Sequence, residues 1–226
     1  MLLRQQFWFF GFKTMCGIIG YIGNREAAPL MIEGLKRLEY RGYDSAGFCT
    51  VSNNQTLIQK DVGKIQEVEK KVNLNGFNGF VGISHCRWAT HGGVTKENAH
   101  PHTDCKNMIS IVHNGIIENF SELKGRLMER GHKFKSSTDT EVIAHLIEEN
   151  YNGSIEEATR KALKQVEGSY ALGIVCAKEP QKLIAARNES PLILGLGTEE
   201  NFIASDVPAI LKHTNRVIYL ENNEMA

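Results

Sequence analysis

The stretch Met-Cys-Gly-Ile-Ile-Gly-Tyr-Ile-Gly, residues 15–23, joins a cysteine to a short apolar run within a chain of 226 residues. A brief apolar run rich in β-branched residues and bounded by glycine is typical of a buried strand. The stretch therefore predicts a strand that begins beside Cys16. It also raises the question of why Met-Cys-Gly, which resembles the beginning of a chain, follows residues 1–14.

Strands are predicted in two batches around a block of helices. The apolar, period-two pattern predicts strands over 17–23, 45–51, 56–63, 79–88 and 108–115, and then over 169–177, 182–187, 191–196, 201–205 and 216–220. The helical period predicts helices over 29–40, 65–72, 119–131, 137–150, 154–168 and 206–213. This order is typical of one α+β domain built from stacked sheet and helix layers.

Capping residues indicate where some of the predicted helices begin and end. Ser154 and Glu157 have the spacing of a capping box at the start of one helix. Gly131 and Gly168 are expected to end two helices. Asp139 lies near the predicted start of the helix over 137–150, where a helix cap is its simplest role.

Composition excludes several classes of partner. Lysine plus arginine number 26 and aspartate plus glutamate number 26, so we expect no nucleic-acid or membrane-surface partner. The five cysteines are scattered without a Cys-x-x-Cys pair, which favours a reducing, cytoplasmic location over a disulfide framework. No apolar run reaches the ~18 residues of a membrane span. Residues 1–14 are interpreted as a leader outside the fold, with 15–226 as the domain; a membrane-touching anchor is the alternative.

Cys16 has two interpretations. It is either a small apolar residue at the start of a buried strand or a nucleophile. If the chain is cut or initiated so that Cys16 becomes the first residue, its α-amine has a pKa of about 7.7–8.0. That amine can accept the thiol proton, and one residue then supplies both nucleophile and base. An internal Cys16, whose nitrogen is part of an amide, cannot act in this way.

Other polar motifs are equally open when each is taken by itself. Arg87 could clamp a substrate carboxylate or lie at a polar strand end. Asn114-Gly115 could form a turn or an oxyanion site. Asp139 could pair with a substrate ammonium group instead of capping a helix. A zinc site is a further hypothesis, with His100, His102 and Cys105 as its ligands, although no fourth ligand stands at a recognised spacing.

Six motifs occur together in one order: "MCGIIGYIG", "RLEYRGYDSAG", "HCRWATHG", "NAHPH", "VHNGIIEN" and "STDTEVIAHLI". From residue 15 to about residue 221 the chain resembles the glutaminase domains of the glucosamine-6-phosphate synthases, which are class II glutamine amidotransferases. The resemblance implies an N-terminal-nucleophile hydrolase fold, a four-layer αββα sandwich. It also implies L-glutamine as the substrate, with no cofactor and no metal.

The same resemblance implies roles for individual residues. Cys16 is similar to the nucleophile, and Arg41 to the arginine that holds the N-terminus. Asn114 and Gly115 resemble the oxyanion pair. The residues that resemble substrate-binding positions are Arg87, Trp88, Thr90, His91 and Asp139.

The wider context stays open at this point. Full synthases carry a sugar-phosphate isomerase region that uses the ammonia to convert fructose 6-phosphate to glucosamine 6-phosphate, and a homodimer is considered for the full-length form. Amidophosphoribosyltransferases and asparagine synthetases, which share the fold, are the enzymatic alternative. A glutamine-binding fragment without turnover is the other alternative, if Cys16 stays internal.

Overall fold

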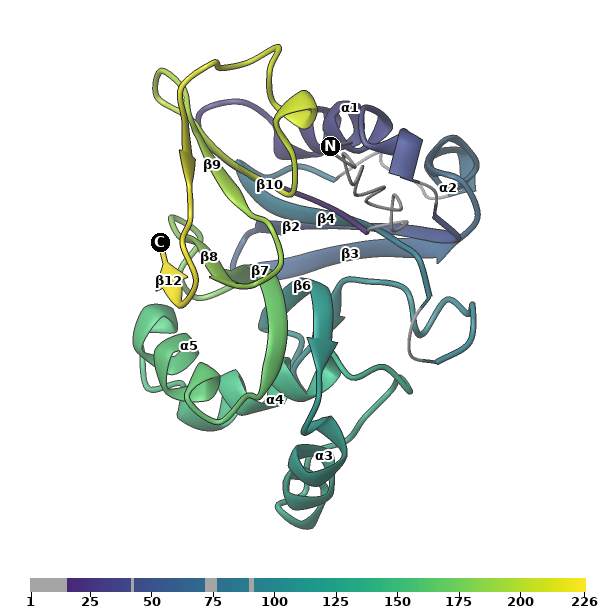
Figure 1. Cartoon of the computed structure of the whole chain (residues 1–226), viewed down its shortest axis with the longest axis vertical. Coiled ribbons are helices and arrows are strands. Elements are labelled where there is room, and N and C mark those ends of the chain that lie inside the picture. Colours follow the sequence, from purple (N-terminus) through teal and green to yellow (C-terminus); the bar gives the residue numbers. More distant parts are fainter. Residues whose placement is uncertain (1–15, 42, 72–76, 90–91) are drawn as a thin grey trace, which may run out of the picture.

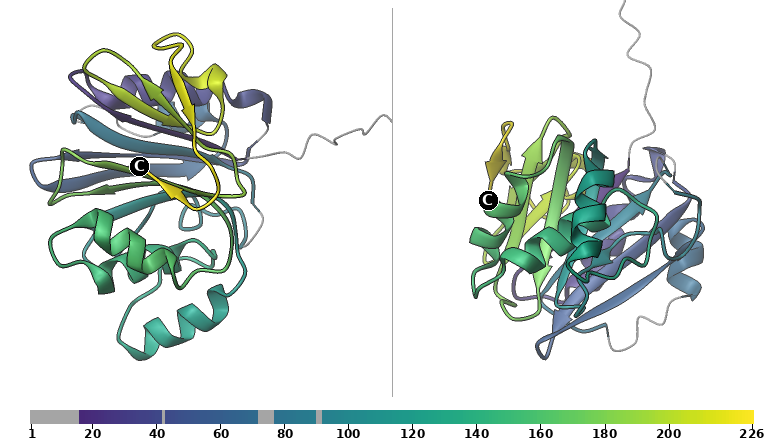
Figure 2. Two further views of the ribbon diagram at one scale, coloured as in Figure 1. Left: turned by 60° about the vertical axis from the view of Figure 1, so that its left-hand side comes forward. Right: turned by 90° about the horizontal axis from the view of Figure 1, so that it is seen from below.

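Two antiparallel β-sheets lie face to face, and helices cover the outer face of each sheet (Figure 1). The computed structural model describes residues 16–41, 43–71, 77–89 and 92–226. Figure 2 shows the resulting succession of helices, sheet, sheet and helices from two further directions. This is the four-layer αββα sandwich that the sequence resemblance implies.

The first sheet has seven strands within the described residues, in the order β11-β9-β10-β1-β4-β2-β3. Its strands are β1 (Gly17–Ile22), β2 (Ser45–Ser52), β3 (Gln55–Val62), β4 (Val81–Arg87), β9 (Ile193–Leu196), β10 (Asn201–Ala204) and β11 (Val217–Tyr219). Helices α1 (Ala27–Lys36) and α2 (Ile65–Lys71) cover its outer face, together with the 3-10 turns η1 (Glu39–Arg41) and η2 (Val207–Ala209).

The second sheet has five strands within the described residues, in the order β12-β8-β7-β6-β5. They are β5 (His102–Thr103), β6 (Ile109–Ile117), β7 (Gly168–Cys176), β8 (Leu183–Asn188) and β12 (Glu224–Met225). Its outer face packs on α3 (Phe120–Glu129), α4 (Glu141–Asn150) and α5 (Ile155–Leu163). The two-residue strands β5 and β12 were not predicted, because so short a segment has no measurable period.

Three apolar cores hold the four layers together. Neighbouring residues of one strand belong to different cores, because their side chains point to opposite faces of the sheet. Ile18 faces the core between the two sheets, whereas the next residue, Ile19, faces the core under α1. In the second sheet, Val112 faces the other sheet and Ile111 faces the helices. Because successive strand residues point to opposite faces, a strand that is buried on both sides is continuously apolar. This explains why the central strands were recognisable from sequence.

Several predicted boundaries were wrong. The segment 29–40 divides into α1 and η1, and 206–213 contains only the 3-10 turn η2. Gly168 does not end a helix but opens β7 with a φ of 116°. The predicted helix start at Ser154 is confirmed, since the Ser154 hydroxyl accepts a hydrogen bond from the Glu157 N–H at 3.2 Å. The Glu157 carboxylate pairs with Arg160. No helix in the described part of the chain combines the length and apolarity that a membrane crossing requires.

Because the two sheets approach each other closely at Gly173, a larger residue there should destabilise the protein. A Cβ on this β7 residue would lie 2.8 Å from Ile203 Cδ1 of the other sheet and 3.1 Å from Val112 Cγ2. We therefore expect Gly173→Val to lower the free energy of unfolding by about 1–3 kcal/mol through overpacking, as measured by urea denaturation.

Gly125→Ala is the matched control, because nothing lies within 4 Å of the added methyl group on the exposed face of α3. It should raise stability by about 0.5–1 kcal/mol. Equal stability of the two variants would contradict the packing described here.

Candidate active site

The register of β1 against β4 brings Cys16 beside Arg87. These strands pair antiparallel with Gly17 opposite Cys86. The start of β1 and the end of β4 therefore lie side by side, and they bring Cys16 next to Arg87. The next residue, Trp88, donates its backbone N–H to Cys16 Sγ at 3.1 Å, and its carbonyl oxygen lies 3.5 Å from the same sulfur. A thiol is thus held at the end of a buried strand.

The second sheet supplies Asn114 and Gly115 to the same place. Both lie inside strand β6, so the alternative that this pair forms a turn is wrong. Asn114 Nδ2 donates to the backbone carbonyl of Cys16 at 3.0 Å. Asn114 Oδ1 lies 2.9 Å from His85 Nε2. A carboxamide oxygen can only accept, so His85 carries its proton on Nε2 and fixes which way the amide points.

Gly115 is required by its backbone conformation. Its φ is 135°, a value that side-chain-bearing residues rarely adopt. An added Cβ would also collide with the carbonyl oxygen of Ser169 on the neighbouring strand β7. The glycine therefore lets β6 keep its pairing while its backbone borders the cavity next to Asn114.

Asp139 approaches the same cavity from the segment before α4. Its carboxylate is buried and accepts a hydrogen bond from the Ile117 N–H at 2.8 Å. The residue at the helix N-cap is Thr140, which makes no side-chain capping bond. The helix-cap alternative for Asp139 is therefore wrong, because the carboxylate is directed to β6 and not to the first turn of α4.

One cavity of about 350 Å³ collects these groups. Six of the residues proposed from sequence line it, namely Cys16, Arg87, Trp88, Asn114, Gly115 and Asp139. Its volume falls within the ~300–1,000 Å³ that is usual for small-molecule sites. Thr90 and His91 lie outside the described residues, and Arg41 is described only as the backbone end of η1.

Burial sets the electrostatics around the thiol. Removal from water raises the pKa of Cys16, although the Trp88 N–H and the positive charge of Arg87 act in the opposite direction. At neutral pH the thiol is accordingly protonated, because its usual pKa is already about 8.5. A nucleophile in this place needs a base to remove that proton.

Arg87 itself is buried, and its guanidinium is held by the loop that follows. Its Nη1 and Nη2 atoms donate to the carbonyl oxygens of Gly93 and Gly92, each at 3.4 Å. The carboxylate of Asp44 accepts the Ala89 N–H at 2.7 Å, and the Asp44 N–H donates to the Arg87 carbonyl at 2.8 Å. Asp44 thereby fixes the path of residues 87–89. The sequence motifs contained Asp44 and His85 without indicating either positioning role.

Four buried histidines, His85, His100, His102 and His113, form a cluster at the cavity, and two of them, His100 and His113, line its wall. The rings of His85 and His100 lie 4.2 Å apart between centroids, and those of His100 and His102 lie 4.6 Å apart. His100 Nε2 and His113 Nδ1 contact the Thr140 hydroxyl at 3.1 and 2.9 Å. These rings support the segment that carries Asp139, a role for which the sequence offered no signal beyond the polar motif at 98–102.

The zinc hypothesis built on His100, His102 and Cys105 is not supported by this arrangement. His102 Nε2 contacts the Thr138 hydroxyl at 3.1 Å within the buried cluster. Cys105 Sγ instead lies 3.7 Å from His132 Nδ1 and 3.6 Å from His145 Nδ1. The three residues therefore do not form one group of ligands among the described residues.

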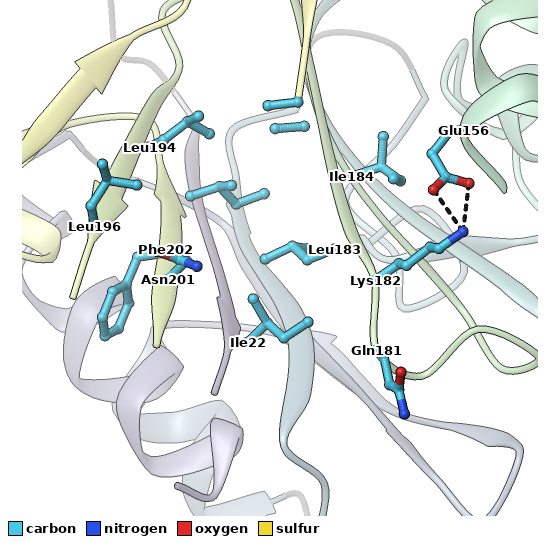
Figure 3. Close-up of a pocket in the computed structure, with 13 residues that line it drawn as sticks. Ile22, Glu156, Gln181, Lys182, Leu183, Ile184, Leu194, Leu196, Asn201 and Phe202 are labelled. Carbon is cyan, nitrogen blue, oxygen red and sulfur yellow. Dashed lines mark hydrogen bonds and ion pairs between the residues drawn. The ribbon is translucent and has the colours of Figure 1, made fainter. Parts of the chain in front are cut away.

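A second cavity, of about 420 Å³, lacks the chemistry of the first (Figure 3). Its lining is mostly aliphatic and includes Ile22, Leu183 and Leu194. Its charged side chains, Lys182 and Glu156, are paired with each other at 2.6 Å. Its described lining contains no cysteine, serine or threonine, so the cavity at Cys16 is the candidate active site.

Comparison with known proteins identifies the family of the chain. A family model described as a glutamine amidotransferase domain matches residues 85–212. The chain is 58% identical over 215 residues to the glutamine–fructose-6-phosphate aminotransferase (isomerizing) of Thermococcus kodakarensis, covering 94% of this chain and 36% of the relative. The chain is also 56% identical over 212 residues to the protein of the same name from Pyrococcus horikoshii, and this match covers 93% of this chain and 36% of the relative. The chain thus spans little more than a third of the length of these curated relatives.

Solved structures show the same fold. The glutamine phosphoribosylpyrophosphate amidotransferase of Bacillus subtilis, complexed with ADP and GMP, superposes with a TM-score of 0.81 and 29% identity, over 93% of this chain and 46% of that one. A class II glutamine aminotransferase domain protein from Silicibacter pomeroyi matches with a TM-score of 0.58 and 13% identity, over 93% of each chain, and supports the fold alone.

The chain belongs to the class II glutamine amidotransferases, enzymes with the N-terminal-nucleophile hydrolase fold. Among them, the curated relatives described above carry the name glutamine–fructose-6-phosphate aminotransferase.

The buried histidines predict a loss of stability on mild acidification. Burial lowers the pKa of His85 from 6.5 to about 3, and burial also lowers the pKa of His100, His102 and His113. Between pH 6.5 and 3 the unfolded chain binds a proton at His85 that the folded chain does not. The free energy of unfolding should therefore fall with decreasing pH, by about 1.4 kcal/mol per pH unit for this group.

Urea denaturation between about pH 7.5 and pH 5 measures this slope, in a window above the ordinary pKa range of carboxylates. His85→Gln, which keeps a donor toward Asn114, should show a shallower slope than the parent protein. Identical slopes would mean that His85 does not contribute.

Proposed function

We propose that this chain hydrolyses the side-chain amide of L-glutamine to glutamate and ammonia, with Cys16 as the nucleophile. The observation that carries the proposal is the Asn114 amide, which His85 orients toward Cys16 across the junction of the two sheets. The amide has two N–H donors, and only one is needed for the Cys16 carbonyl. The second donor and the Gly115 N–H are proposed to bind the oxygen of the substrate amide.

The two charged residues on the cavity wall are proposed to hold the other end of glutamine. Arg87 offers a planar set of donors that suits the α-carboxylate. Asp139 offers a carboxylate that suits the α-ammonium group. Trp88 follows directly on Arg87, and we propose that it belongs to a glutamine-binding loop with Thr90 and His91. Arg41 is proposed to hold the N-terminus of Cys16.

The proposed reaction uses side chains, one amine and water. The Cys16 sulfur gives up its proton to the amine and attacks the amide carbon of glutamine, so that negative charge collects on the oxygen facing Asn114 and Gly115. Collapse of this adduct breaks the carbon–nitrogen bond, and ammonia leaves with the proton from the amine. Water then cleaves the γ-glutamyl thioester, which releases glutamate and restores the thiol.

The base in this scheme is the α-amine of Cys16 itself. The pKa of the thiol is raised by burial, and the Trp88 backbone groups at the sulfur are not bases. We therefore propose that residues 1–14 are a leader or upstream extension, that the functional domain is 15–226, and that Met15 is removed as well. An amine with a pKa of about 7.7–8.0 is partly neutral at physiological pH and can take the proton.

The ammonia is proposed to serve amino-sugar synthesis. The relatives with more than 50% identity are named for transfer of an amino group from glutamine to fructose 6-phosphate, and this chain spans only about a third of their length. We propose that a sugar-phosphate isomerase region, in the same protein or on another chain, uses the ammonia to make glucosamine 6-phosphate. A cytoplasmic location and a homodimeric full-length enzyme are part of the same proposal.

A second candidate function is glutamine binding without turnover. It is favoured by one fact: in the chain as written, the nitrogen of Cys16 is bonded to Met15 as an amide. Such a chain would keep the Arg87 and Asp139 groups for binding, but it would lack the base.

Glutamate release from two forms of the protein distinguishes these candidates. Protein whose first residue is Cys16 should hydrolyse glutamine, whereas protein that retains residues 1–15 should show little or no turnover. Cys16→Ala in the shortened form should abolish activity, because the attacking sulfur is lost. Titration calorimetry should still detect the binding of glutamine to this variant. Full activity with residues 1–15 attached, or activity in the alanine variant, would contradict the proposed mechanism.

Asn114→Ala tests the oxyanion role in the shortened form. Loss of one donor that acts mainly in the transition state should lower kcat by about 10²–10³-fold with little change in KM. Asn152→Ala, at an exposed position before α5, is the matched control and should leave both constants unchanged. A rise in KM with kcat preserved would assign Asn114 to substrate binding instead.

A further inference from the structure

Four side chains with metal-binding atoms converge at a second place in the fold, outside the candidate active site. They are Cys105, in the turn between β5 and β6; His132, in the loop after α3; and His145 and Glu148, three residues apart on α4. None of them lines the cavity at Cys16. Three segments that are distant in sequence thus direct a thiol, two imidazoles and a carboxylate at one point.

Five of the six distances between the ligand atoms are close to the edges of a small tetrahedron, and all the atoms lie within 4.8 Å of one another. The two Nδ1 atoms lie 3.2 Å apart, and they lie 3.1 and 3.3 Å from Glu148 Oε2. Cys105 Sγ lies 3.7 and 3.6 Å from the Nδ1 atoms of His132 and His145. A tetrahedral Zn²⁺ ion with bonds of about 2.0–2.1 Å to nitrogen and ~2.3 Å to sulfur requires edges of about 3.3–3.6 Å.

Each imidazole also has a carboxylate on its far side. His132 Nε2 lies 3.5 Å from Glu149 Oε1. His145 Nε2, which is buried and has no hydrogen-bond partner within the described residues, lies 3.7 Å from Glu141 Oε1. Metal-bound histidines typically direct their second nitrogen to a carboxylate, which orients the ring and strengthens the ligand. The backbone N–H of Lys133 points to Cys105 Sγ at 3.4 Å, as suits a thiolate.

Hydrogen bonds can also hold the four groups, with the Cys105 thiol donating to one Nδ1 and the other Nδ1 donating to Glu148 Oε2. Glu148 Oε2 can accept a proton from each Nδ1, but the two N–H groups then face each other across 3.2 Å. If one Nδ1 is unprotonated, it can accept a hydrogen bond from the Cys105 thiol or from the other Nδ1. One divalent cation satisfies all four lone pairs at once.

We propose that Cys105, His132, His145 and Glu148 bind one Zn²⁺ ion as a closed, structural site. Mixed sulfur, nitrogen and oxygen ligands in a tetrahedron select zinc over Mg²⁺ or Ca²⁺, which prefer six or more oxygen ligands. Four protein ligands leave no open position for substrate, and this distinguishes a structural zinc from a catalytic one.

The proposed zinc would connect α4 to the turn that carries Cys105 and to the loop that carries His132. Glu141, the outer partner of His145, also accepts hydrogen bonds from the N–H groups of Lys135 and Ser136 at 2.8 and 2.7 Å. The segment so held leads directly to Asp139. The zinc would therefore stiffen one wall of the candidate active site, although zinc binding does not depend on the proposed glutaminase activity.

Metal titration of the full 226-residue chain after chelator treatment tests the site. We expect one equivalent of Zn²⁺ to bind and to raise the melting temperature, because a ligand that binds only the folded state stabilises it. Co²⁺ as a probe should give the visible absorption of a tetrahedral site together with a thiolate-to-cobalt charge-transfer band in the near ultraviolet.

Variants assign the ligands. Cys105→Ser should remove the charge-transfer band, and His145→Gln should weaken Zn²⁺ binding by more than the ~10–100-fold expected for an outer partner such as Glu149→Gln. Cys16→Ala removes a different thiol and should still bind one equivalent. Glu149→Gln changes no ligand, so it reports on the site even if a ligand variant fails to fold.

Three results would overturn the proposal. They are absence of stoichiometric binding, an octahedral Co²⁺ spectrum, and binding that is equally strong in Cys105→Ser and His145→Gln.

Discussion

The antiparallel pairing of β1 with β4 is the constraint on which the candidate site depends. It sets Gly17 opposite Cys86, and it therefore carries Cys16 to the end of the strand that Arg87 and Trp88 continue. Gly17 is needed there, since a Cβ would lie 2.6 Å from Cys86 Sγ. A shift of one residue would exchange the two faces of β1 and destroy the cores on both sides. Packing of the sandwich thus specifies the position of the thiol.

Burial then determines which groups at the site carry charge. The thiol of Cys16 and the ring of His85 are both shifted toward their neutral forms by removal from water. Arg87 and Asp139 are the charged side chains on the cavity wall, and each is held by backbone groups. Their opposite charges are complementary to the two charged groups of a free amino acid. The thiol in the same cavity is neutral, so the proposed function requires a separate base, for which an α-amine on the same residue is the simplest source.

Helix α4 joins this site to the proposed zinc site. Asp139 precedes its first turn, Glu141 lies in that turn, and His145 and Glu148 follow on its next turns. The buried histidines of the first site support the segment before α4 through the Thr140 hydroxyl. A helix held at its start by these rings and further along by the proposed zinc would be a rigid platform for the Asp139 carboxylate, as its proposed role in substrate binding requires.

The sequence by itself determined the long strands and most of the helices, and it named the candidate site residues. Apolar runs revealed the long strands, Ser154 revealed a helix start, and ordered motifs pointed to Cys16, Arg87 and Asn114-Gly115. Only the tertiary structure decided that β6 continues through Asn114-Gly115 to Ile117 instead of turning there. It also decided that His85 orients the Asn114 amide and that Cys105 lies beside His132 instead of His100. The physical reason is that periodicity and capping depend on neighbours within a few residues. Contacts across 27 or 29 positions, as between Cys105 and His132 or His85 and Asn114, depend on strand register and on how helices pack over the sheets.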